Sequence, residues 1–234
     1  MHAETTIPAR YNGPPTSGNG GYSCGVLAAY INGPARVRLH VPPPLGVALR
    51  VVDTADGGVE MYDGETLVGG AVPASLDLDI PAPPSLAEAQ AAMGRYPCYE
   101  GHSFPSCFVC GPERPDHDGL EIFPGQVTDS ALLACPWHPA GDMLDTLGYV
   151  RPEIVWSALD CPGYFAAMGE RLRPAVLGEL VGELFARIRG TEHLVVYAWP
   201  LGEDGRKSYA GTAIATADGE LLAASRSTWI ELKT

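Results

Sequence analysis

The carboxylate Asp160 stands near the middle of an apolar stretch of helix length that runs from residue 152 to residue 168, with Glu153 at its start. Pro152 suits the first turn of a helix, and Pro162 predicts a kink within it. Its neighbours are almost all apolar, which is typical of a helix buried on every side. A buried carboxylate is costly unless it is hydrogen-bonded or used in catalysis. We therefore expect a raised pKa for Asp160 and a role as general base or nucleophile, with a hydrogen-bonded core carboxylate as the alternative.

Two glycines, Gly20 and Gly21, precede a second apolar stretch that predicts a helix over residues 22–31. Backbone N–H groups at a helix start have no acceptor within the helix, and they lie at the positive end of its dipole. The amides of Gly20, Gly21 and Tyr22 are therefore candidates for an oxyanion hole. A flexible turn is the alternative interpretation of the glycine pair.

Residues 21–25 also fit the Gly-x-Ser-x-Gly pattern of a nucleophile elbow, with Ser23 as the nucleophile. An elbow needs a strand running into it and a helix leaving it, within a chain of alternating strands and helices. Turn-forming residues precede Ser23, and that alternation is missing. A serine hydrolase acting through Ser23 is thus the less favoured hypothesis, and Ser23 is expected to line the mouth of a pocket.

Cys107 and Cys110 have the spacing of half a zinc site. The residues near enough in sequence to complete it are Cys98, His102 and His117. A second pair of ligands does not appear in the usual spacing, so we expect no metal and treat Cys107 and Cys110 as weak candidates. Cys135 and Cys161 are expected to be buried small apolar groups.

The composition limits the class of partner. The chain of 234 residues has 15 basic and 28 acidic side chains and a formal charge of −13. Such a balance argues against nucleic acid or an anionic membrane as a partner. No apolar run approaches the length of a membrane span, and six cysteines in a chain this large indicate reduced thiols. We expect a cytoplasmic protein.

Short alternating segments between turn residues predict antiparallel strands in both halves of the chain. They are residues 35–41, 46–53, 59–62, 66–76, 120–123, 131–136, 176–189, 193–201, 207–217 and 221–231. Ser85 and Glu88 predict a capping box at the start of a short helix over 85–93. Each half is a buried helix followed by a meander, which predicts an α+β fold with units at 1–84 and 119–234. Residues 85–118 form the expected linker helix and cysteine-containing loop.

A few short motifs carry a likeness to a known family. They are Cys107-Phe108-Val109-Cys110-Gly111-Pro112 with Gly119-Leu120-Glu121-Ile122, Leu159-Asp160, Gly20-Gly21 and Pro42-Pro43-Pro44-Leu45. Together they resemble the hotdog-fold acyl-CoA thioesterases, with two hotdog units in one chain. The resemblance implies two antiparallel sheets, or one continuous sheet, each unit wrapping a central helix. It also implies that Asp160 is the catalytic carboxylate.

The sequence departs from the family where Arg151-Pro152, rather than two glycines, precedes the helix that carries Asp160. Hotdog units build sites across their interface, so the resemblance implies one composite site with amides from the first half and the acid from the second. Its implied substrate is a small-molecule acyl thioester, with coenzyme A as part of the substrate and no other cofactor. The alternative is a non-catalytic protein that binds acyl-CoA or lipid.

Several other residues are expected to contact the substrate. Arg151 is a candidate for the coenzyme A phosphates, and Trp156 and Tyr164 are candidates for the acyl pocket. Asn19 and Ser23 are expected beside them. Exposed sheet edges also make a homodimer an expectation.

Overall fold

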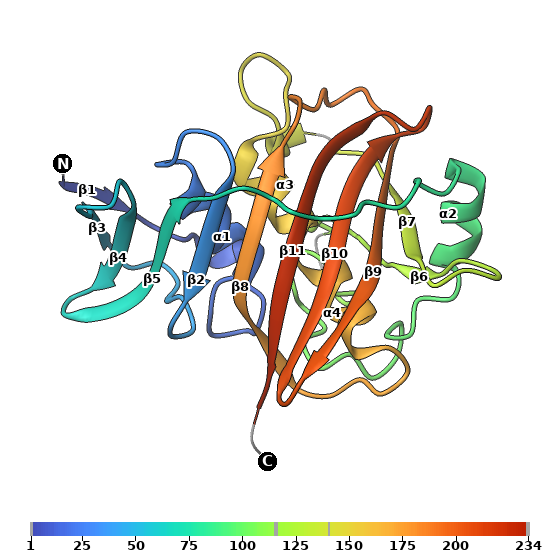
Figure 1. Cartoon of the computed structure of the whole chain (residues 1–234), viewed down its shortest axis with the longest axis horizontal. Helices are drawn as coiled ribbons and strands as arrows, with labels where there is room; N and C mark the ends of the chain where they lie inside the picture. Colours follow the sequence, from blue (N-terminus) through green and yellow to red (C-terminus); the bar gives the residue numbers. More distant parts are fainter. Residues whose placement is uncertain (1, 115–116, 140, 233–234) are drawn as a thin grey trace.

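The computed structural model describes residues 2–114, 117–139 and 141–232. Its described strands form one continuous antiparallel sheet of eleven strands, in the order β1-β3-β4-β5-β2-β8-β11-β10-β9-β7-β6 (Figure 1). The α+β arrangement therefore takes the continuous form of the expected sheet, and two separate sheets are not seen. The strands are β1 (His2–Thr5), β2 (Ala35–Leu39), β3 (Leu49–Asp53), β4 (Val59–Asp63), β5 (Thr66–Pro73), β6 (Gly125–Gln126), β7 (Leu133–Trp137), β8 (Ala175–Leu184), β9 (Leu194–Asp204), β10 (Lys207–Thr216) and β11 (Leu221–Glu231).

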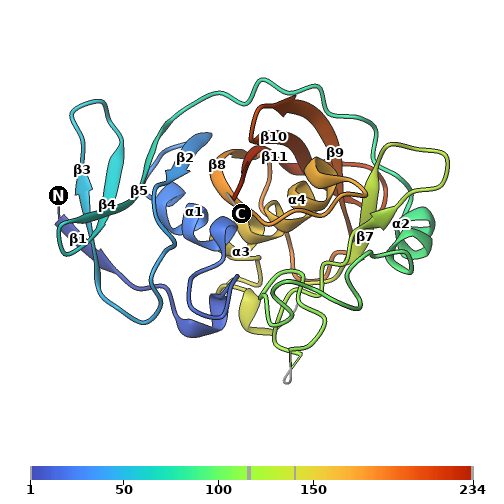
Figure 2. The same ribbon diagram turned by 90° about the horizontal axis from the view of Figure 1, so that it is seen from below.

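Three α-helices lie on the inner side of the curved sheet, as Figure 2 shows, and a fourth lies at its edge beside β7. The inner helices are α1 (Gly20–Ala28), α3 (Pro152–Ala158) and α4 (Cys161–Met168), and the edge helix is α2 (Leu86–Met93). Two short 3-10 helices cover Ala9–Tyr11 and Gly141–Met143. Among the described residues, no helix combines the length and apolar character needed to cross a bilayer.

The two halves of the chain meet where β2 pairs with β8. Ala35 lies opposite Gly182, and Arg38 lies opposite Glu179, with which it forms an ion pair at 3.6 Å. Strands of the first half lie on one side of this pair and strands of the second half on the other. The pairing brings α1 and α3 under one sheet, although the proposed unit boundaries stay a prediction.

Residues 74–85 cross the outer face of the sheet, opposite the three inner helices (Figures 1 and 2). Leu76, Leu78 and Ile80 pack against a second core cluster on this face. Tyr197 Oη donates a hydrogen bond to Pro81 O at 3.0 Å, which fixes the crossing segment to β9. This segment thus covers apolar sheet surface that the helices leave open.

The helix expected over residues 152–168 is two helices, because the chain breaks at Leu159 and Asp160. Pro162 lacks an N–H, and its ring blocks the carbonyl of Ala158, so α3 ends there. Asp160 becomes the residue before α4, with φ −86° and ψ −78°.

The strand expected at 120–123 is wrong: Glu121 has a positive φ of 52°, which is incompatible with an extended strand.

Candidate functional site around Asp160

Helices α1 and α3 pack in unusually close contact because α1 carries glycine at two facing positions. A Cβ at Gly21 would lie 2.5 Å from both Trp156 O and Asp160 Cβ. A Cβ at Gly25 would lie 2.6 Å from Glu153 Cα. Only glycine permits this approach of two backbones. The start of α1 is thereby held beside Asp160.

Asp160 receives two hydrogen bonds on one oxygen. Gly21 N–H donates to Oδ2 at 2.8 Å, and Asn19 Nδ2 donates to the same oxygen at 2.9 Å. The other oxygen, Oδ1, is buried and has no hydrogen-bond partner among the described residues. Asp160 as a whole is 2% exposed. One oxygen is therefore fixed in place while the other keeps its full capacity to accept a proton.

Burial is the main cause that raises the pKa of Asp160, to about 7. The hydrogen bond from Gly21 N–H opposes the rise, the nearby Cys107 thiol adds to it, and the Asn19 amide opposes it. The direction is the one expected from an acid inside an apolar helix. A carboxyl group with such a pKa can exchange a proton near neutral pH.

The three amides expected to form an oxyanion hole have different partners. Gly21 N–H is bound to Asp160, and Tyr22 N–H donates to Asn19 Oδ1 at 2.9 Å as part of the helix cap. Gly20 N–H has no acceptor in the part of the chain that the structure describes. A Cβ at Gly20 would lie 2.9 Å from Leu177 Cδ2 and 3.3 Å from Asp160 Oδ2. Gly20 N–H is thus the unoccupied donor beside the acid.

Ser23 is fully buried, and its Oγ donates to Asn19 O at 2.8 Å. The residues just before α1 form no strand, and the described sheet is antiparallel throughout. The structural context of a nucleophile elbow is therefore missing around Ser23.

Of the residues expected to bind substrate, some lie beside Asp160 and others have partners elsewhere in the protein. Asn19 lies against Asp160, and the Trp156 carbonyl faces Gly21. Arg151 Nη2 donates to Tyr11 Oη at 2.8 Å, and its Nη1 lies 3.1 Å from a Glu153 carboxylate oxygen.

Tyr164 has its own partner: its Oη donates to Arg173 O at 2.9 Å. The ring of Trp156 packs on Gly182, where a Cβ would lie 2.8 Å from the ring. Both Arg151 and Tyr164 thus make contacts within the protein that a ligand would have to share or replace.

Two surface hollows of the described residues lie away from Asp160. One, of about 470 Å³, lies on the outer side of β2, β4 and β5 and includes Arg36 and His40. The other, of about 340 Å³, lies at the start of α3 and includes Val155 and Phe185. Neither is lined by Asp160.

One neighbour of Asp160 was not anticipated as a polar group. Cys161 Sγ lies 3.8 Å from Asn19 Nδ2 and 3.8 Å from Cys107 Sγ, so it faces both the site and the loop that carries Cys107. The sequence signal that could have indicated this role is the position of Cys161, directly after Asp160 and directly before Pro162.

No protein-family model and no curated protein sequence matches this chain. Solved structures match it over almost the whole length. A tesB protein of Mycobacterium avium subspecies paratuberculosis is 13% identical, with a TM-score of 0.63, over 99% of this chain and 93% of that one. An acyl-CoA thioesterase II from Mycobacterium marinum is 10% identical, with a TM-score of 0.62, over 100% and 93%.

A third match is a protein of unknown function with a hotdog fold from Alicyclobacillus acidocaldarius. It is 12% identical, with a TM-score of 0.65, over 100% of this chain and 94% of that one. At such identities the likeness establishes the fold. The hotdog resemblance expected from the sequence is confirmed at that level.

Proposed function

We propose that this protein hydrolyses acyl thioesters, with Asp160 as the general base. The observation that carries the proposal is the asymmetric carboxylate: Oδ2 is held by the start of α1, and Oδ1 is buried without a partner. The fold supports the same class, since solved structures that share it include an acyl-CoA thioesterase II. The proposed substrate is a small-molecule acyl thioester, and coenzyme A is its proposed leaving thiol.

In the proposed step, Asp160 Oδ1 accepts a proton from water as the water oxygen attacks the thioester carbonyl carbon. The carbonyl oxygen becomes an oxyanion, and the unoccupied Gly20 N–H, at the positive end of α1, is the donor that we propose to stabilise it. Collapse of the tetrahedral intermediate breaks the carbon–sulfur bond. The proton held by Asp160 then passes to the departing thiolate, and the acid product is released.

This proposal requires a route to a carboxylate that is 2% exposed. Leu177 packs on Gly20, so its side chain is the one we expect to move when an acyl group enters. A preference for apolar acyl groups would follow, because Asp160 lies among buried apolar side chains.

The second candidate is a protein that binds acyl thioesters without turning them over. The specific observation in its favour is that Asp160 lines neither of these two hollows. It also fits the full occupation of Gly21 N–H and Tyr22 N–H within the protein.

The test is an acyl-CoA panel of increasing chain length, with released thiol as the readout. Wild type should hydrolyse at least one member, and Asp160→Asn should lower that rate by about 10² or more. Asp129→Asn is the matched control: the same change at an exposed residue with a positive φ that asparagine accepts. Calorimetry with the same panel then separates binding from turnover.

The outcomes are distinct. An unchanged rate in a folded Asp160→Asn variant would refute the role of Asp160. Binding by wild type without hydrolysis of any panel member would replace the proposal with the second candidate.

A further inference from the structure

Three cysteine sulfurs converge beside Asp160 from two separate segments. Cys107 and Cys110 come from the loop between α2 and β6, and Cys161 is the first residue of α4. Their Sγ atoms all lie within 4.8 Å of one another, and Cys107 Sγ to Cys161 Sγ is 3.8 Å. A zinc ion with Zn–S bonds of about 2.3 Å places tetrahedral sulfurs about 3.8 Å apart. We propose that Cys107, Cys110 and Cys161 bind one zinc ion.

The turn from Cys107 to Gly111 is shaped to present its first sulfur. Gly111 N–H donates to Cys107 O at 2.9 Å, which closes the turn. A Cβ at Gly111 would lie 2.4 Å from Cys107 N, so no other residue fits.

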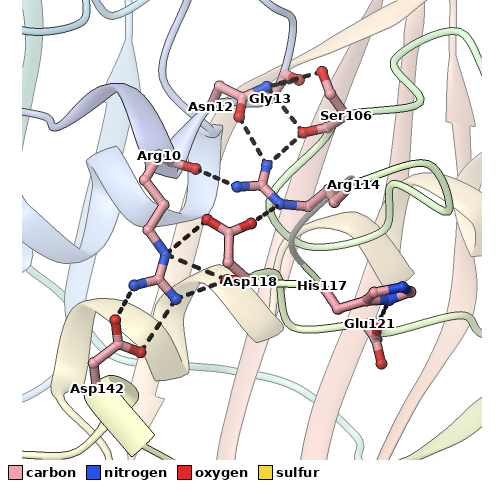
Figure 3. A network of polar contacts seen from close by, with 9 residues as sticks. All are labelled: Arg10, Asn12, Gly13, Ser106, Arg114, His117, Asp118, Glu121 and Asp142. Carbon is pink, nitrogen blue, oxygen red and sulfur yellow. Dashed lines mark hydrogen bonds and ion pairs between the residues drawn. The ribbon is translucent and has the colours of Figure 1, made fainter.

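Polar contacts hold this turn on both sides of Cys107, and Figure 3 shows those that join Ser106, Arg114 and Asn12. Arg114 Nη1 donates to Ser106 O at 2.5 Å and to Asn12 Oδ1 at 2.9 Å. Phe108 N–H donates to Asn12 O at 2.8 Å. The residues before and after Cys107 are thus fixed to the segment that precedes α1. The sulfur is therefore positioned before any ion arrives.

All three cysteines are buried and present as free thiols. Asn19 Nδ2, 3.8 Å from Cys161 Sγ, adds a donor on the side of α4. Soft thiolate ligands select zinc over magnesium or calcium. The loop and the helix start then share one ion, which would fix the position of Asp160 relative to α1.

His102 is near the cluster but is engaged differently. Its Nε2 lies 3.4 Å from Cys110 Sγ, while its Nδ1 accepts the Phe104 N–H at 2.9 Å. The ring proton therefore resides on Nε2, which makes His102 a donor to the Cys110 sulfur rather than a ligand. A fourth, non-protein ligand completes the tetrahedron, as in zinc sites with three protein ligands.

The test uses the full chain without a polyhistidine tag, produced with added zinc and purified under reducing conditions. Elemental analysis should give about one zinc per chain for wild type. Cys107→Ser and Cys161→Ser should each lower the zinc content at least about tenfold. Cys135→Ser is the matched control, since Cys135 is an equally buried thiol on β7 outside the cluster. It should keep its zinc.

Cobalt exchange into wild type gives a readout that needs no variant. Tetrahedral Co²⁺ bound by thiolates should show a sulfur-to-cobalt charge-transfer band and intense visible bands. Wild type without stoichiometric zinc and without these bands, or a disulfide between Cys107 and Cys161 in its place, would overturn the zinc site. Equal zinc in Cys161→Ser and Cys135→Ser would overturn it too. None of these readouts depends on thioester hydrolysis, so the zinc site and the proposed function fail separately.

Discussion

Replacing Gly21 by alanine should destabilise this protein even though alanine is the better helix former. Helix propensity favours alanine by about 0.5–1 kcal/mol. Against it, the new Cβ would lie 2.5 Å from Trp156 O and from Asp160 Cβ. Neither is the far end of a flexible side chain, so α1 and α3 must separate, and such overpacking costs about 1–3 kcal/mol.

Separation also breaks the buried hydrogen bond from Gly21 N–H to Asp160 Oδ2, which is 2.8 Å long. A hydrogen bond to a charged group contributes about 1.5–3 kcal/mol. The steric and hydrogen-bond losses outweigh the propensity gain, and the expected net loss for Gly21→Ala is about 2–5 kcal/mol.

Two matched variants separate the causes. Gly25→Ala meets Glu153 Cα at 2.6 Å, a similar steric conflict without a bond to Asp160, so we expect a loss of about 1–2 kcal/mol. Gly94→Ala meets only Ala91 O at 3.7 Å, and Gly94 has a helical φ of −63°. That variant should be neutral or up to about 1 kcal/mol more stable.

The assay is equilibrium unfolding in urea together with thermal melting. For a chain of this size each kcal/mol shifts Tm by about 2–4 °C, so Gly21→Ala should melt on the order of 10 °C below wild type. Gly25→Ala should fall between Gly21→Ala and Gly94→Ala. If Gly21→Ala has the same Tm as Gly94→Ala, then α1 and α3 are not in this contact and Asp160 is not held by α1.

Two further substitutions test how the surroundings of the site are held. Arg114→Lys keeps the charge but loses the planar fork that serves Asp118, Asn12, Ser106 O and Arg10 O. The free energy of unfolding should fall by about 2–3 kcal/mol, and a change within about 0.5 kcal/mol would contradict the network. Ser85→Ala removes the cap of α2 and should cost about 1 kcal/mol in urea unfolding. If Ser85→Ala unfolds at the same urea concentration as wild type, the capping box contributes nothing to the free energy of unfolding.

Local patterns were sufficient for the last two strands of the chain. The ranges 207–217 and 221–231 were expected, and β10 and β11 span Lys207–Thr216 and Leu221–Glu231. Gly205 and Gly219 have positive φ values of 60° and 89° and form the turns that bound β10. Alternation and turn residues are local signals, so a single sequence carries them. The capping box of α2 was predictable for the same reason, and it is confirmed.

Long-range packing could not be predicted from local sequence patterns. The pairing of β2 with β8 joins Ala35 to Gly182, and nothing local specifies that register. Residues 77–84 were assigned to no predicted helix or strand, and no packing role was expected for them. The alternation of Leu76, Leu78 and Ile80 was the missed signal, for it places three apolar side chains on the sheet.

The acid and the glycine amides were expected to meet, and they do, but they bind each other. A helix start attracts the nearest buried anion, and here that anion is Asp160 itself rather than a substrate oxygen. Sequence spacing could not reveal this, because the break before Pro162 turns Asp160 from mid-helix to the residue before α4. The same break brings Cys161 Sγ to 3.8 Å from Cys107 Sγ. The groups left for the proposed hydrolysis are therefore Asp160 Oδ1 and the Gly20 N–H, which this pairing does not occupy.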